Sequence, residues 1–355
     1  MADQLPSSDS TKSAAQKAAK GRISDARKLS KSPEAWASDI IRGNRKALSQ
    51  AITLTESAKP GDQLLLDQVL QSLQTKKEEM ASVRIGITGV PGVGKSTFIE
   101  QYGLLLAKQG HHVAVLAVDP SSGITKGSIL GDKTRMELLA KHENAFIRPS
   151  PTAAALGGIT RGTHEATLLC EAAGFDRILI ETVGVGQSEI AVRQCSDAFI
   201  LLMLPGGGDE LQGIKRGIME MADVLLINKA DGNGLPLARE TAAQYLQALH
   251  LFPPNPAGHS VDVQLISALQ NEGINEFEEH LKRLITGWQA NGSFLSRRGD
   301  QAAELFAQHV QHLSIQSRLN DATGQRIWDE TMAAVRSGQT DPYTAARNWL
   351  EKGTS

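Results

Sequence analysis

The residues with the clearest chemical use form a glycine-rich segment that directly follows the apolar run Val83–Thr88. Its sequence, GVPGVGKST, has the pattern GxxxxGK[ST]. Glycines let the backbone wrap a polyphosphate with its N–H groups pointing inward, and a helix that starts near Lys95 adds its positive dipole end. In this pattern the lysine reaches the β- and γ-phosphates, and the hydroxyl of the next residue, Ser96, ligates Mg²⁺. We therefore predict a phosphate-binding loop that consists of Gly89, Val90, Pro91, Gly92, Val93, Gly94, Lys95, Ser96 and Thr97.

A second segment indicates which base the site reads. The apolar run Val224–Ile227 ends in the sequence NKAD, which contains Asn228, Lys229 and Asp231. The Asp231 carboxylate can accept the N1–H and the exocyclic amine of guanine, a pair of donors that adenine lacks. Asn228 can contact guanine N7 or tie this loop to the phosphate-binding loop, and the stem of Lys229 can lie on the base face. The segment favours GTP and GDP over adenine nucleotides.

A third segment completes the predicted base site. The run Val261–Ile266 is followed by Ser267, Ala268 and Leu269, where a backbone N–H is expected to meet guanine O6. Because this sequence comes after both the phosphate loop and NKAD, the three together predict one guanine-nucleotide site.

Two acidic residues stand directly after apolar runs between these segments. Asp119 follows Val113–Val118, and Glu181 follows Ile178–Ile180. At the carboxyl ends of strands both can face the γ-phosphate and Mg²⁺, which prefers hard oxygen ligands. Ordinary loop acids at strand ends are the alternative. The inserted strand with its acidic end resembles the branch of P-loop proteins that contains signal-recognition and metal-insertion GTPases.

Longer stretches of the chain are similar to one family. The segments GVPGVGKST, AVDPSS, GSILGDKTRM, FIRPSP, ETVGVGQSE, GGGDELQGIKRGIMEMAD, NKAD and SAL occur in this order. They closely resemble the MeaB/ArgK family, whose members are GTPase chaperones of adenosylcobalamin-dependent methylmalonyl-CoA mutase. The resemblance covers roughly residues 35–350. It implies hydrolysis of GTP with Mg²⁺, a homodimer, and an adenosylcobalamin-dependent acyl-CoA mutase as the partner.

The resemblance also implies roles for particular residues. Asp119 and Glu181 match the magnesium-linked acids of the family, and Asp132, in GDKTRM, matches a switch region that supports hydrolysis. Lys215 lies in a third switch loop that responds to the mutase. The expected catalytic residues are therefore Lys95, Asp119, Asp132, Glu181 and Lys215, and the expected metal ligands are Ser96, Asp119 and Glu181.

The pattern of apolar runs predicts the elements that position these residues. Short apolar runs alternate with helical stretches, which indicates an α/β P-loop NTPase fold with a mostly parallel sheet covered on both faces. We expect a flexible lead-in over 1–32, a helical N-terminal arm over 33–82 with a turn at Lys59–Asp62, and the GTPase domain over 83–291. A helical dimerisation extension is expected over 292–355. The expected strands are Val83–Thr88, Val113–Val118, Ala145–Ile147, Ile178–Ile180, Ala198–Leu204, Val224–Ile227 and Val261–Ile266, and the expected helices between them include Lys95–Lys108, Arg161–Ala173, Glu210–Met221 and Leu237–Leu249.

Composition limits the classes of function. Lys plus Arg is 37 and Asp plus Glu is 39, a net charge of -2 that gives no reason to invoke nucleic acid or an anionic membrane. No apolar run approaches the ~20 residues that span a bilayer. Cys170 and Cys195 are expected to be buried core thiols, and the chain is expected to be cytoplasmic, although a basic, Ser-rich start leaves a mitochondrial transit peptide open.

Two other functions remain as alternatives. A metal-insertion GTPase would be expected to carry a His-rich tract or CxxC, and neither occurs in the sequence. A small-molecule or protein kinase of the ArgK type would need an acceptor site, for which no signature is found. The identity of the client mutase is not encoded in these motifs.

Overall fold

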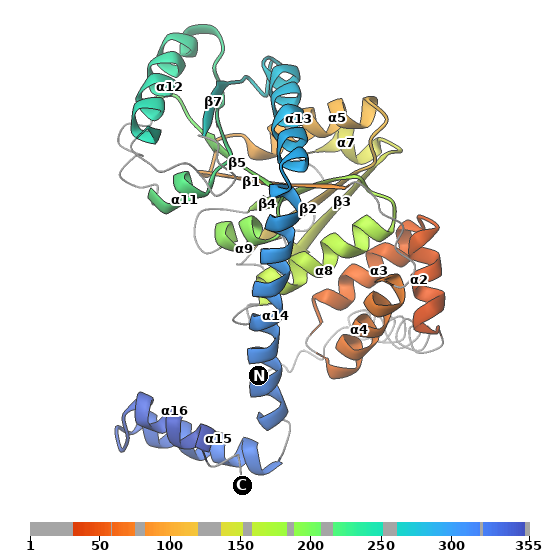
Figure 1. Ribbon diagram of the computed structural model, residues 1–355, viewed down its shortest axis with the longest axis vertical. Helices are drawn as coiled ribbons and strands as arrows, with labels where there is room; N and C mark the ends of the chain where they lie inside the picture. The colour runs from red at the N-terminus through yellow and green to blue at the C-terminus, as the bar shows by residue number, and fades with distance from the viewer. Residues whose placement is uncertain are drawn as a thin grey trace, which may run out of the picture.

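A parallel sheet forms the centre of the molecule (Figure 1). The computed structural model describes residues 31–57, 59–74, 82–119, 136–151, 158–182, 188–206, 216–250, 261–319 and 322–351. Within these residues the sheet has the strand order β3-β2-β4-β1-β5-β6-β7, and its neighbouring strands pair in parallel. The strands are β1 (Val83–Gly89), β2 (Val113–Asp119), β3 (Ala145–Pro151), β4 (Arg177–Thr182), β5 (Ala198–Met203), β6 (Val224–Ile227) and β7 (Asp262–Leu265). This arrangement confirms the predicted fold class.

The predicted strands agree with the structure except at their ends. β3 runs four residues past the predicted end at Ile147, because Pro149, Ser150 and Pro151 continue the pairing with β2. Prolines are tolerated there because β3 is an edge strand, whose outer side needs no partner. Since parallel strands share one direction, the segments after β1, β2, β4, β6 and β7 meet at one edge, where the predicted site lies.

Helices cover both faces of the sheet, as the apolar strands require. Leu179 of β4 packs on the face covered by α5 and α13, whereas its neighbours Ile178 and Ile180 pack on the face covered by α8 and α9. α8 begins three residues before the predicted Arg161, and residues 210–215 of the predicted helix Glu210–Met221 lie outside the described part. The helices of this unit are α5 (Lys95–Lys108), α7 (Glu137–Lys141), α8 (Gly158–Ala172), α9 (Ser188–Gln194), α11 (Arg216–Met221), the 3₁₀ turn η1 (Gly232–Gly234), α12 (Leu235–Leu249) and α13 (Ile274–Ala290).

The N-terminal arm packs outside α8 and consists of α2 (Pro33–Ile41), α3 (Arg45–Thr55) and α4 (Pro60–Gln74). The predicted turn at Lys59–Asp62 was wrong: α4 begins at Pro60, because proline suits the first position of a helix, where its missing N–H costs nothing. The first helical run instead divides before α3, where the side chain of Asn44 accepts hydrogen bonds from the N–H groups of Lys46 and Ala47 at 3.1 Å each.

The C-terminal part projects from this body. α14 (Ser293–Leu319) starts against the sheet and runs away from it, with α15 (Ala322–Arg336) and α16 (Pro342–Glu351) at its far end (Figure 1). Trp328 and Trp349 hold α15 and α16 together with ring centroids 5.1 Å apart. Among the described helices, none is both long and apolar enough to cross a membrane.

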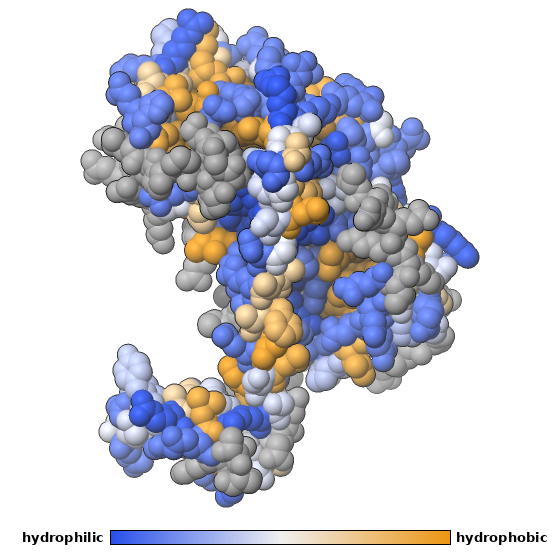
Figure 2. Space-filling view, in the orientation of Figure 1, coloured by the Kyte–Doolittle hydropathy of each residue, from blue (hydrophilic) through white to orange (hydrophobic). Residues whose placement is uncertain are grey.

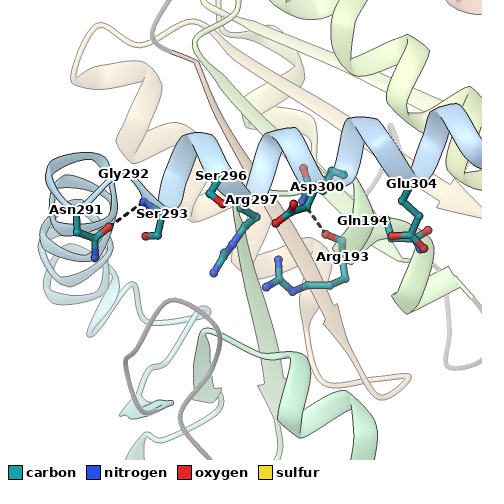
Figure 3. A pocket seen from close by; sticks show the side chains of 10 residues that line it. Arg193, Gln194, Asn291, Gly292, Ser293, Ser296, Arg297, Asp300 and Glu304 are labelled. Carbon is teal, nitrogen blue, oxygen red and sulfur yellow. Dashed lines mark hydrogen bonds between the residues drawn. The ribbon is translucent and has the colours of Figure 1, made fainter.

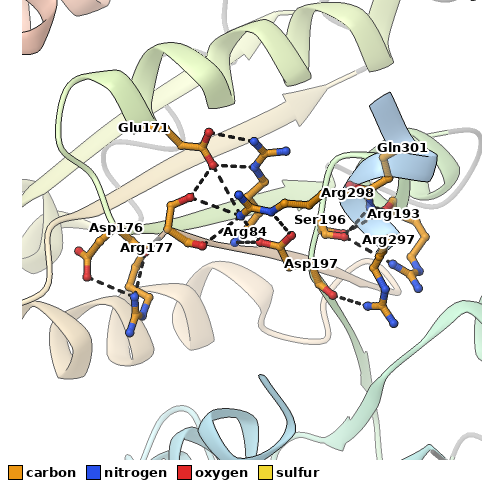
Figure 4. A network of polar contacts seen from close by, with 11 residues as sticks. Arg84, Glu171, Asp176, Arg177, Arg193, Ser196, Asp197, Arg297, Arg298 and Gln301 are labelled. Atoms are coloured by element: carbon orange, nitrogen blue, oxygen red, sulfur yellow. Dashed lines mark hydrogen bonds and ion pairs between the residues drawn. The ribbon is translucent and has the colours of Figure 1, made fainter. Parts of the chain in front are cut away.

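Ion pairs anchor α14 to the edge of the sheet opposite the predicted site (Figure 4). Arg298 donates to both carboxylate oxygens of Asp197 at 2.7 and 2.6 Å, and Asp197 also accepts the backbone N–H of Arg84 at 2.8 Å. The Arg84 guanidinium in turn binds both oxygens of Glu171 on α8 at 2.8 and 2.9 Å. Because Arg84, Glu171 and Asp197 are almost fully buried, the charge of each depends on its partner.

We predict that Glu171 makes the free energy of unfolding depend on pH in the acid range. Burial would raise its pKa, but the hydrogen bonds from Arg84 and Ser82 hold it at about 2, below the ordinary 4.5. A carboxyl with a depressed pKa adds stability that is complete above pH 4.5 and is lost as the pH falls toward 2. Glu171→Gln should lower the free energy of unfolding at neutral pH by about 3 kcal/mol, because Arg84 loses its charged partner. It should also flatten the fall in stability below pH 4.5.

Denaturant unfolding across this pH range measures both effects. The exposed pair of Glu137 with Lys141 supplies the control, and Glu137→Gln should change neither. If the Glu171→Gln protein had the wild-type free energy of unfolding and the same dependence on pH below 4.5, the proposed contribution of Glu171 to stability would be wrong.

Candidate functional site

The predicted phosphate loop lies between β1 and α5, at the carboxyl edge of the sheet. At two positions of this loop only glycine fits, because other atoms lie too close to leave room for a Cβ. Gly94 has φ 95°, and a Cβ there would lie 2.7 Å from Nδ2 of Asn228. A Cβ on Gly89 would lie 2.4 Å from the carbonyl oxygen of Leu202 on β5. The backbone of the loop therefore packs directly against its neighbours. α5 begins at Lys95, and because its N-cap residue is Gly94, no side chain caps its first N–H groups.

Lys95 is held inside this loop. Its Nζ donates to the carbonyl oxygens of Gly89 at 2.7 Å and Val90 at 3.3 Å, and the side chain is buried. Burial lowers the pKa of Lys95, while the charges of Glu181 and Glu189 oppose this shift. The ammonium is thus already positioned in the loop, where phosphate oxygens can replace the carbonyls as its partners.

Glu181 lies beside the loop at the end of β4. The Ser96 hydroxyl donates to Oε1 of Glu181 at 3.2 Å, and the hydroxyl of Thr182, the following residue of β4, is 2.9 Å from that of Thr88 on β1. A hydroxyl and a carboxylate are the hard oxygen donors that Mg²⁺ takes, so these two predicted ligands fit the ion. Asp119 is the last residue of β2, which pairs in parallel with β4, so its backbone lies at the same edge of the sheet as Glu181. Its side chain lies outside the described residues.

The NKAD segment joins the two loops of the predicted base site. Asn228 donates from Nδ2 to the carbonyl of Val93 at 2.8 Å and accepts at Oδ1 from the N–H of Ala268 at 2.9 Å. Of its two expected roles, tying the loop to the phosphate loop is the one that the contacts support. Lys229, with φ 62°, donates from Nζ to the carbonyl of Gly92 at 2.9 Å, so its side chain spans the same gap.

Asp231 is oriented by the third predicted segment. The Ser267 hydroxyl donates to Oδ2 of Asp231, and the N–H of Gln270 donates to the Ser267 oxygen at 3.2 Å. Asp231 is half-buried, whereas Leu269, the last residue of the third predicted segment, is 76% exposed. The carboxylate therefore points in a fixed direction before any base arrives.

The structure thus brings together most of the predicted residues. Lys95, Ser96 and Glu181 meet at the phosphate end, and Asn228, Asp231, Ser267 and Ala268 meet at the base end. Asp132 and Lys215 lie outside the described residues.

Three polar residues at this edge were not predicted. Thr88 and Thr182 form the hydroxyl pair beside Glu181, and Glu189, in the first turn of α9, is fully buried with its charge acting on Lys95. A threonine at the end of each of two apolar runs was the signal for the first pair. Glu189 is the last residue of the segment ETVGVGQSE, so it could have been noticed as an acidic residue close to the predicted site.

The fold and this edge define a P-loop GTPase: the predicted phosphate loop lies between a central strand and a helix, and the two predicted base loops follow neighbouring strands. Residues 48–323 match the family described as methylmalonyl Co-A mutase-associated GTPase MeaB, and the chain belongs to this family.

Known proteins from several sources are similar over most of the chain. The GTPase ArgK of Escherichia coli is 41% identical over 312 residues, covering 88% of this chain and 94% of that protein. The mitochondrial methylmalonic aciduria type A homolog of Mus musculus is 48% identical over 271 residues, covering 74% of this chain and 65% of that protein. A crystal structure of a LAO/AO transport system kinase is 34% identical, covers 91% of this chain and 98% of that one, and superposes with a TM-score of 0.68.

Asp231→Asn should weaken guanine binding. The change replaces an acceptor with a donor that faces the exocyclic amine, and one mispaired group costs about 1–3 kcal/mol. GDP affinity should therefore fall by roughly tenfold, and xanthosine diphosphate, which has a carbonyl at that position, should bind better than to the wild type. Calorimetric titration of both nucleotides measures the switch, with the exposed Asp329→Asn on α15 as a control. Unchanged GDP affinity would rule out this base loop.

Lys95→Ala should abolish hydrolysis while the protein stays folded. The ammonium contacts loop carbonyls rather than core side chains, so its loss removes a phosphate partner. Phosphate release and circular dichroism together test this, and Lys108→Ala, exposed at the other end of the same helix, is the matched control. A folded Lys95→Ala protein that hydrolyses GTP at the wild-type rate would show that catalysis occurs elsewhere.

Proposed function

We propose that this protein is a GTP-driven switch that binds adenosylcobalamin-dependent methylmalonyl-CoA mutase, or a related acyl-CoA mutase, gates loading of adenosylcobalamin and protects the enzyme during turnover. Family membership supports this function. The observation that carries it is the assembled nucleotide site, in which Lys95, Asn228 and Asp231 are positioned by the protein's own loops. Cys170 and Cys195 are buried and unpaired, which suits a reducing compartment such as the cytoplasm.

The proposed site holds GTP or GDP with Mg²⁺. Ser96, Glu181 and Asp119 are the proposed magnesium ligands, and the ion would neutralise charge on the phosphates. The backbone of Gly89–Thr97 and the Lys95 ammonium would surround the β- and γ-phosphates. Asp231 would read guanine, the backbone at Ser267–Leu269 would face O6, and Lys229 would lie on the base.

Hydrolysis in this proposal is mostly a matter of position and charge. The γ-phosphoryl group transfers to water through a state with charge spread over its oxygens, which Lys95 and the loop N–H groups stabilise. Asp132 and Lys215, on segments that the family resemblance assigns to switches, are proposed to act when the mutase docks. A partner that orders such segments supplies orientation that the free protein lacks.

We also propose that the protein is a homodimer through its C-terminal helices. Apolar side chains gather along the lower part of α14 (Figure 2). Phe306, Val310 and Leu313 are 71%, 44% and 48% exposed and lie on one stripe of the helix, and α15 has no buried residue. A second copy would cover these faces.

A kinase of the ArgK type remains the second candidate, because a similar solved structure carries the name of a LAO/AO transport system kinase. A metal-insertion GTPase is the third. Product analysis separates them: orthophosphate from GTP alone indicates a GTPase, and phosphate on an added acceptor indicates a kinase.

GTP hydrolysis should be slow in the isolated protein and rise when the mutase binds. Lys215→Ala should remove most of the stimulated part, because it deletes a charge from the segment that the partner is proposed to order. Phosphate release with and without an adenosylcobalamin-dependent acyl-CoA mutase from the same organism measures this, and Lys141→Ala, 75% exposed on α7, is the control. The switch proposal would be wrong if phosphate release were equally fast with and without the mutase although a complex forms. It would also be wrong if the isolated protein hydrolysed GTP fast.

A further inference from the structure

Two buried threonines lie where the central strands β1 and β4 part. Backbone pairing between these strands ends at Ile87 with Glu181. Beyond that pair β1 continues to pair with β5 on its other side, and β4 continues to pair with β2. Thr88 and Thr182 are the next residues along the two strands. The strand ends that carry the predicted site therefore each pair with a different neighbour from this point on.

The side chains of these two threonines join the strands beyond the last backbone pair. Their Oγ1 atoms are 2.9 Å apart, and Thr88 and Thr182 are 1% and 0% exposed. Among the described residues, each hydroxyl has the other as its hydrogen-bond partner. A hydroxyl this deeply buried has no water to replace a lost partner, so removing either one leaves the other unsatisfied. The pair is therefore a specific link between β1 and β4.

This link lies on the opposite face of the sheet from the contact that Glu181 makes with α5. Successive side chains of a strand point to opposite faces. Ile180 packs on the face covered by α8 and α9, so Glu181 points to the face of α5, and Thr182 points back to that of α8 and α9. Ile87 packs on the α5 face, which places Thr88 on the same face as Thr182. The end of β4 is thus held to β1 on one face and to the start of α5 on the other.

Packing alone does not require hydroxyls at these positions. Valine has nearly the shape of threonine, suits a buried strand and has no polar atom to satisfy. Replacing both partners of a buried hydrogen bond by apolar groups of the same shape can be nearly neutral for stability. What the pair adds is position: Thr182 directly follows Glu181, and Thr88 directly precedes Gly89, the first residue of the predicted phosphate loop.

We propose that Thr88 and Thr182 are positioning residues for the magnesium site: their hydroxyl pair fixes the end of β4, and with it the Glu181 carboxylate, relative to Ser96 and the phosphate loop. The inference rests on the proposed function, in which Ser96 and Glu181 hold Mg²⁺. The two hydroxyls are directed at each other, so they act through Glu181 and not on the ion itself. Loss of a group that supports a metal ligand typically costs about 10- to 100-fold in metal affinity or activity.

Thr182→Val tests the pair, because it removes the hydroxyl and keeps the shape of the side chain. With a non-hydrolysable GTP analogue bound, the affinity for Mn²⁺, which takes the same oxygen ligands as Mg²⁺, should fall about tenfold, and kcat should fall by a similar factor. Affinity for the analogue without metal should stay within about twofold of wild type, because Lys95 and the base loops are unchanged. Electron paramagnetic resonance of Mn²⁺, phosphate release and calorimetry measure the three values.

Two further variants separate positioning from stability. Thr182→Ser keeps the hydroxyl and loses a methyl group, so it should be less stable than wild type and yet keep Mn²⁺ affinity and kcat within about threefold. The double variant Thr88→Val with Thr182→Val leaves no hydroxyl unpaired, so its denaturant midpoint should lie closer to wild type than that of Thr182→Val. Its Mn²⁺ affinity should nevertheless stay about tenfold low.

Two control variants remove hydroxyls elsewhere. Thr167 of α8 is equally buried, and its hydroxyl donates to the carbonyl oxygen of Thr163 in the same helix at 2.8 Å, so Thr167→Val matches the chemistry of the test. Ser296 lines a cavity of about 690 Å³ between α9 and the start of α14, at the edge of the sheet opposite the predicted site (Figure 3). Thr167→Val and Ser296→Ala should both leave Mn²⁺ affinity and kcat at their wild-type values.

Several results would overturn the proposal. Wild-type Mn²⁺ affinity in a folded Thr182→Val protein is one, and recovery of that affinity in the double variant is another, because the pair would then serve stability alone. A loss in Thr182→Ser as large as in Thr182→Val is a third. If Thr182→Val does not fold, as judged by circular dichroism, the double variant is compared with wild type directly, and equal Mn²⁺ affinity overturns the proposal.

Failure of the proposed function gives a different result. A wild-type protein that binds the GTP analogue but takes up no Mn²⁺ with it would show that the proposed magnesium site is itself wrong, and the role of the threonines would fall with it. Mn²⁺ uptake by the wild type that is equal in Thr182→Val would leave the magnesium site standing and overturn only the role of the pair.

Discussion

The amide of Asn228 is the contact on which the nucleotide site depends. Its nitrogen binds the phosphate loop at Val93 and its oxygen binds the base loop at Ala268, so one buried side chain sets the distance between the two. Gly94 must lack a side chain because this amide occupies the space. The loops that we propose to hold the phosphates and the base are therefore joined through one side chain.

The two edges of the parallel sheet serve different purposes. At the carboxyl edge, strand ends carry the groups proposed to bind GTP and Mg²⁺. At the other edge, buried acids directly before β5 and β6 hold the arginines of α14, and Figure 4 shows the pair of Asp197 with Arg298. α9 lies between these two ends of the strands: the Arg193 carbonyl near its last residue accepts from Gln301 of α14, and the charge of Glu189 in its first turn opposes the lowering of the Lys95 pKa.

Much of this could be predicted from sequence, because the signals are local. Buried parallel strands appear as apolar runs, and glycines at fixed spacing predicted a loop where the structure has one, between β1 and α5. The helix start at Pro60 was missed because a Pro-Gly pair also suits a turn. The contact of Gln301 with the carbonyl oxygens of Arg193 and Ser196 could not be predicted, because every residue has a backbone carbonyl and these two lie about a hundred residues away.

The anchoring of α14 has a consequence for where this protein can be cut. Asp197 and Asp223 are 1% and 0% exposed, and Arg298 and Arg297 neutralise them from the start of α14. A fragment that ends with α13 would lose both arginines. Its two buried aspartates would then lack their cationic partners, which lowers the free energy of unfolding. A stable fragment of the α/β body therefore needs at least the first two turns of α14, which contain Arg297 and Arg298, so the start of this helix belongs to the body as much as to the C-terminal part.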